Sequence, residues 1–128
     1  MKRLSFKIPI YTWNFQLIIL ENSDDAEEVR KIANKYKFPD TEDLVKHVKD
    51  LSHDGGKTYT KRSSRDLIVI IFPHVSEAGL VGTINHEKRH VIDDILEWHE
   101  VHDKEAAAYL DGWVSEQLYK QLKSIKAL

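Results

Sequence analysis

Hydrophobic positions along the chain form short strand-like runs in its first half and helical stripes in its second half. Residues 4–11 and 15–21 are rich in β-branched and aromatic side chains, which favour strands. Residues 12–14 predict a turn, so the two runs form a hairpin or two adjacent strands. Pro9 lacks the N–H group that a sheet ladder needs, which predicts that the first strand lies at a sheet edge.

Two helical patterns follow these strands. Ser23 and the acidic residues after it predict a helix start, because serine caps free N–H groups and acids complement the helix dipole. Apolar residues then repeat at helical spacing until Pro39, which ends this helix. A second, shorter helix is predicted for residues 41–51.

The middle of the chain contains one strongly apolar segment. Residues 53–56 include two glycines and predict a turn. The polar residues 57–65 predict a strand followed by a loop. Residues 67–72 are all apolar, which is typical of a central strand covered on both faces, and Pro73 ends the strand.

The C-terminal part predicts two long helices, over residues 76–98 and 103–122, and a frayed tail over 123–128. The first helix carries an apolar stripe of Leu80, Ile84, Val91, Ile95 and Trp98. The whole pattern predicts an α+β fold, with a small sheet of three to four strands and two long C-terminal helices. We expect one domain over residues 1–128, with N-terminal strands and helices in 1–65 and a metal-site half in 66–122.

Composition narrows the possible partners. The chain has 128 residues, 41% hydrophobic and 31% charged, with a net charge of −2 and no cysteine. The charge provides no positive field for nucleic acid or an anionic membrane, and the missing cysteines exclude a disulfide scaffold, a cysteine zinc finger and a thiol nucleophile. No apolar run approaches the ~20 residues of a membrane span, and the basic N-terminus lacks a signal-peptide apolar stretch. We expect a cytoplasmic protein without nucleic-acid or membrane partners.

His86, Glu87 and His90 form the pattern H-E-x-x-H inside the first long C-terminal helix. Residues four apart lie one above the other on a helix, so both imidazoles can bind one zinc ion. Glu87 is rotated by about 100° from His86, which predicts a general base beside the metal. The alternative is that both histidines are ordinary exposed helix residues.

A catalytic zinc ion needs a third protein ligand, and the next helix offers Glu105. The connection between the two helices is long enough to bring Glu105 back to the metal. Asp103, His99 and His102 are rival ligands, and Glu105 has another possible role as a first-turn acid. Tyr109 lies one turn after Glu105, as a candidate hydrogen-bond donor to a developing oxyanion or as a core residue.

These residues resemble the zincin metallopeptidases, in particular the gluzincins. Residues 67–122 are similar to small peptidases related to the ImmA/IrrE family of mobile elements and to gluzincin-like proteins of phages and prophages. The resemblance implies a zinc ion held by His86, His90 and Glu105, Glu87 as general base, and an extended peptide paired with a sheet edge. Lys88 and Arg89 depart from the usual zincin pattern, because two cations beside a dication are unfavourable unless they face solvent or pair with acids.

Two functions follow as hypotheses. The first is a zinc-dependent metallopeptidase that hydrolyses a peptide or protein substrate with an activated water and a glutamate base. The alternative, which Lys88 and Arg89 favour, is a catalytically silent zincin-like module of a phage or mobile element that binds metal or another protein. The sequence contains no signal for an oligomeric state.

Overall fold

A computed structural model of the chain describes residues 1–50 and 55–128. The sheet has the strand order β1-β2-β4-β3. Its strands are β1 (Lys2–Ile8), β2 (Trp13–Ile19), β3 (Gly56–Lys61) and β4 (Asp66–Ile71). β1 runs antiparallel to β2, β3 runs antiparallel to β4, and the central strands β2 and β4 are parallel.

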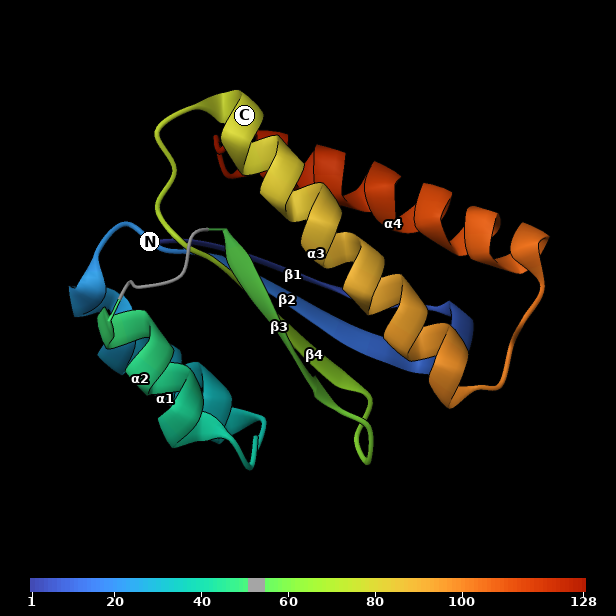
Figure 1. Cartoon of the computed structure of the whole chain (residues 1–128), viewed down its shortest axis with the longest axis horizontal. Helices are drawn as coiled ribbons and strands as arrows, with labels where there is room; N and C mark the ends of the chain where they lie inside the picture. Colours follow the sequence, from blue (N-terminus) through green and yellow to red (C-terminus); the bar gives the residue numbers. More distant parts are fainter. Residues whose placement is uncertain (51–54) are drawn as a thin grey trace.

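Helices cover both faces of this mixed sheet. They are α1 (Ala26–Lys35), α2 (Thr41–Asp50), α3 (Glu77–Trp98) and α4 (Lys104–Ser124). The first pair packs on one face, and the long C-terminal pair packs on the other (Figure 1). The α+β fold with four strands and two long C-terminal helices is therefore confirmed.

β4 is the central strand that its sequence predicts. It lies between β2 and β3, and all six of its residues are buried. Leu67, Val69 and Ile71 belong to the core beneath α3 and α4, whereas Ile68 and Ile70 belong to the core beneath α1 and α2. Coverage on both faces explains the unbroken apolar run from Leu67 to Ile71. Asp66, the first residue of β4, is also buried and accepts hydrogen bonds from Asn14 and Ser64.

The first strand lies at a sheet edge, as Pro9 predicts, but the boundaries of the hairpin differ from those predicted. β1 ends at Ile8, because Pro9 adopts helical backbone angles and begins a short 3₁₀ turn over Ile10–Thr12. Tyr11 and Thr12 both have positive φ angles, which reverse the chain direction. The turn therefore lies at residues 9–12 rather than 12–14, and β2 begins at Trp13.

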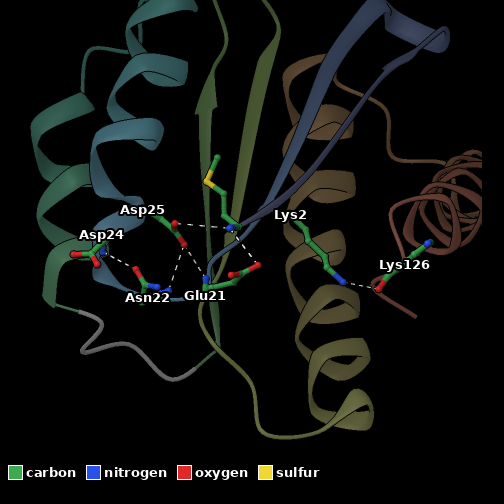
Figure 2. Close-up of polar contacts among 7 residues, drawn as sticks. Lys2, Glu21, Asn22, Asp24, Asp25 and Lys126 are labelled. Carbon is green, nitrogen blue, oxygen red and sulfur yellow. Dashed lines mark hydrogen bonds and ion pairs between the residues drawn. The ribbon is translucent and has the colours of Figure 1, made fainter.

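Asn22, rather than Ser23, caps the start of the first helical region. The Asn22 side chain accepts a hydrogen bond from the Asp24 N–H, and the Asp25 carboxylate accepts one from the Asn22 N–H (Figure 2). This capping box opens a 3₁₀ turn over Ser23–Asp25 that leads directly into α1.

The C-terminal tail is folded back rather than frayed. α4 continues to Ser124, after which Lys126 takes a positive φ and the Ala127 N–H bonds to the Leu122 carbonyl. The Lys2 ammonium group donates to the Lys126 carbonyl, which joins the two ends of the chain (Figure 2). The predicted fraying is wrong because these bonds satisfy the last turn of the helix.

Two sequence predictions fall partly outside the described residues: the turn at 53–56 and the end of the helix over 41–51. The strand predicted within 57–65 is confirmed as β3, followed by a loop. In the described part of the chain, the helices lack the combination of length and apolarity that crossing a bilayer requires.

Candidate metal site

α3 holds the two motif histidines one above the other on its exposed side. The helix begins where the Ser76 hydroxyl accepts a hydrogen bond from the Gly79 N–H. Ile84, Val91 and Ile95 of its predicted apolar stripe are buried, whereas Trp98 is exposed. His86 and His90 lie on the exposed side of the helix. The Nε2 atoms of these two rings are 3.2 Å apart.

This spacing fits a zinc ion. Two nitrogen ligands of a tetrahedral zinc, each at about 2.0–2.1 Å, lie roughly 3.3 Å apart. Glu87 completes a group of three side chains whose ligand atoms all lie within 4.8 Å of one another. The donor set, two imidazoles and a carboxylate, is one that zinc accepts.

Glu87 is buried although its histidine neighbours are exposed. Only 4% of Glu87 is accessible to solvent, and its Oε2 accepts a 2.6 Å hydrogen bond from the Thr58 hydroxyl of β3. Gly56 lies against the same side chain, where a Cβ atom would sit only 2.9 Å from Glu87 Cγ. β3 therefore supplies both the hydrogen-bond donor and the space that hold this carboxylate.

An open cleft of about 450 Å³ lies between the two histidines and β3. It is lined by Gly56, Lys57, Thr58, His86, Glu87, His90 and Asp94. β3 is an end strand of the sheet, and the Phe72 N–H bonds to the Gly55 carbonyl. Antiparallel pairs alternate, so the N–H and C=O groups of Gly56, Thr58 and Thr60 point away from β4, toward the free edge.

The two cations inside the motif are directed away from the histidines. The Lys88 ammonium group lies 2.9 Å from Asp111 and 2.8 Å from the Ser115 hydroxyl, both on α4. Burial alone would raise the pKa of Asp111, but the hydrogen bond and charge of Lys88 bring that pKa below its ordinary value. Arg89 pairs with Asp93, 3.3 Å away, as the sequence allowed.

Glu105 is not part of the metal-binding group formed by the described residues. It is exposed in the first turn of α4, where its backbone N–H bonds to the Asp103 carboxylate. α4 meets the motif turn of α3 through Asp111, six residues further on, which corresponds to about 9 Å of helix rise. In this structure α4 packs on the side of α3 that carries Lys88, and Glu105 lies outside the histidine group. Glu105 as the third ligand therefore stays a prediction.

Tyr109 and the rival ligands also lie outside this group. Tyr109 is 67% exposed and does not line the cleft. Asp103 caps α4, and His102 lies near it in a separate hollow. His99 accepts a 3.0 Å hydrogen bond from the Trp13 indole N–H. Each of these side chains therefore has a location distinct from the histidine pair.

β3 contributes to this site in a way that was not predicted from the sequence. Thr58 contacts Glu87, and the Thr60 hydroxyl donates a hydrogen bond to Asp94, which lines the same cleft. Threonines two residues apart point to the same face of a strand. The alternation of Thr58 and Thr60 in a polar strand was therefore a signal that β3 carries a polar face.

Comparisons of the chain with protein-family models, curated proteins and solved structures give no match. A functional conclusion therefore depends on the geometry of the site itself.

Proposed function

We propose that this protein is a zinc-dependent metallopeptidase whose site is formed by His86, Glu87 and His90. The observation that carries the proposal is the pair of imidazole nitrogens 3.2 Å apart beside a buried carboxylate. Exposed histidines one turn apart are common, but here a buried glutamate offers a carboxylate oxygen within 4.8 Å of both imidazole nitrogens. The combination favours a metal site over two unrelated surface histidines.

His86 and His90 would hold the ion, and Glu87 would move the proton. When bound, zinc supplies Lewis acidity that polarises the scissile carbonyl and activates the attacking water. The hydrogen bond from Thr58 occupies Oε2 of Glu87 and leaves its other oxygen to accept a proton from that water. Glu87 then passes the proton to the leaving amine.

The free edge of β3 supports a peptide as the substrate. Gly56 and Thr58 line the cleft and direct backbone groups toward the edge, where these groups pair with no other strand among the residues that the structure describes. An extended peptide can add to such an edge as a further strand. The same proposal includes action in the cytoplasm, with which the absence of cysteine is compatible.

A catalytically silent metal-binding module is the second candidate, in the setting of a phage or mobile element that the resemblance suggests. It is favoured by the position of Glu105, which leaves His86, Glu87 and His90 as the metal-binding group among described residues. If Glu87 itself binds the ion, this group contains no separate general base. Metal binding without hydrolysis is the result that distinguishes this module from the peptidase.

The test measures zinc affinity and peptide cleavage in the wild type, Glu87→Gln and a control, Glu97→Gln. Glu97 is an exposed glutamate of the same helix that does not line the cleft. Glu87→Gln is expected to retain zinc and lose about 100-fold or more of kcat, because a general base contributes at least that factor. The control is expected to cleave like the wild type. Unchanged cleavage by Glu87→Gln contradicts the proposed base, and zinc binding by an inactive wild type favours the silent module.

A further inference from the structure

Two roles compete for the Glu87 carboxylate. Its nearest oxygen lies within 4.8 Å of both histidine nitrogens, so a modest side-chain movement brings it to an ion between them. Glutamate is itself a common zinc ligand. A carboxylate bound directly to a dication is much less basic than a free one, because the ion withdraws charge from it. Glu87 therefore serves either as a ligand or as an effective base.

Thr58 lies where it can determine which of these two roles Glu87 takes. Its hydroxyl donates to Glu87 Oε2 over 2.6 Å from the strand side of the cleft, opposite the helix that carries the histidines. The absence of a Cβ atom at Gly56 leaves room for Glu87 Cγ, so the carboxylate can lie against β3. A charge-assisted hydrogen bond of this length is among the stronger protein hydrogen bonds.

We propose that Thr58 is a positioning residue that holds Glu87 against β3 and off the metal, so that the carboxylate acts as a base. The inference rests on the proposed zinc site. The Thr58 side chain contacts Glu87, while its backbone lies on the free strand edge. A peptide added to that edge therefore pairs with the residue that orients the base.

Two variants of Thr58 test this role. Thr58→Val removes the hydroxyl at nearly constant volume, and Thr58→Ser restores it. Ser115→Ala is the matched control, because it removes a hydroxyl contact to α3 at Lys88, on the α4 side of the helix. Cobalt(II) alone, substituted for zinc, reports the ligand set through its visible spectrum without any need for activity.

We expect Thr58→Val to change the cobalt spectrum, because the released carboxylate reaches the ion. Its kcat is expected to fall about tenfold with KM within about twofold, since the base and not the peptide contact is displaced. Thr58→Ser and Ser115→Ala are expected to resemble the wild type in spectrum and kcat. Wild-type spectrum and kcat in Thr58→Val overturn the inference.

A crystal structure of the zinc-loaded wild type provides a second test that does not depend on the folding of a variant. A Glu87 oxygen at bonding distance, about 2.0–2.2 Å from zinc, overturns the inference, whereas a retained Thr58 contact supports it. A wild type that binds neither metal overturns both the inference and the proposed function. A wild type that binds cobalt without cleaving peptides overturns the proposed function and the role of Glu87 as a base. The spectra then still decide whether Thr58 holds Glu87 off the metal.

Discussion

Thr60 binds Asp94 as Thr58 binds Glu87, two residues further along the same face of β3. The Thr60 hydroxyl donates a 2.7 Å hydrogen bond to Asp94 Oδ2. Glu87 and Asp94 are seven residues apart on α3, which is two helical turns. The two threonine–acid pairs thus fasten the edge strand to the helix at two successive points.

Loss of the hydrogen bond between Thr60 and Asp94 is expected to lower the free energy of unfolding. Thr60→Val removes the donor and leaves the half-buried Asp94 carboxylate without it, so we expect the free energy of unfolding to fall by about 1–2 kcal/mol. Urea denaturation followed by circular dichroism measures the change. Thr60→Ser retains a hydroxyl and is expected to recover most of it. Equal stability of the valine and wild-type proteins contradicts a contribution from this bond.

A side chain at position 56 is expected to disturb the site. A Cβ atom there would lie 2.9 Å from both Glu87 Cγ and the Ile70 backbone oxygen, and a backbone atom cannot move aside cheaply. Gly56→Ala is therefore expected to lower the free energy of unfolding by about 1–3 kcal/mol. Gly112→Ala is the control, because a Cβ there meets nothing within 4 Å on α4. It is expected to raise stability by about 0.5–1 kcal/mol in the same assay.

His99 is expected to make stability depend on pH. It accepts a hydrogen bond from the buried Trp13 indole, and burial together with the nearby charge of Arg65 lowers the pKa of His99 below 6.5. Between the folded and unfolded pKa values the unfolded chain binds more protons. The stabilisation from neutral His99 is therefore complete above pH 6.5 and is lost as the pH falls through the folded pKa.

Unfolding free energies measured from about pH 7.5 to about pH 5 in the wild type and His99→Gln isolate this effect, because the other histidines titrate in both proteins. We expect the stability advantage of the wild type to shrink as the pH falls. Parallel pH curves for the two proteins contradict the assignment to His99.

The ligand set is expected to exclude Glu105. Because its carboxylate is exposed on α4 and outside the histidine group, Glu105→Ala is expected to change zinc affinity by less than about twofold. His90→Ala removes a direct ligand and is expected to weaken zinc binding about 100-fold or more. Calorimetric titration with zinc measures both. A loss in Glu105→Ala as large as that in His90→Ala restores Glu105 as the third ligand.

Structural features that depend only on residues close together in the chain can be predicted from the sequence. The unbroken apolar run of β4 indicates a central strand, and the four-residue spacing of His86 and His90 places both rings on one side of a helix. The first strand does lie at an edge, but Pro9 is in the turn after Ile8, so its missing N–H group does not fall in the ladder.

Which residues of different helices and strands come together in the fold cannot be predicted from such local patterns. The distance from Glu105 to the histidines depends on which side of α3 the next helix packs against. That side is set by apolar residues of both helices that share one buried core, such as Val91 and Val114. The contact of Thr58 with Glu87 joins residues 29 positions apart and depends on how β3 lies over α3. Neither arrangement follows from the periodicity of a single element.

The cleft is built from one continuous stretch of chain. The described residues that line it lie between Gly56 and Asp94, within β3 and α3, which β4 connects. The parallel pairing of β2 with β4, by contrast, must close a loop that contains α1, α2 and β3. Short loops close at lower entropic cost and form faster. The β3–β4 hairpin and α3, the helix that carries the histidines, therefore have the topology of an early folding unit. The N-terminal strands dock onto this unit later.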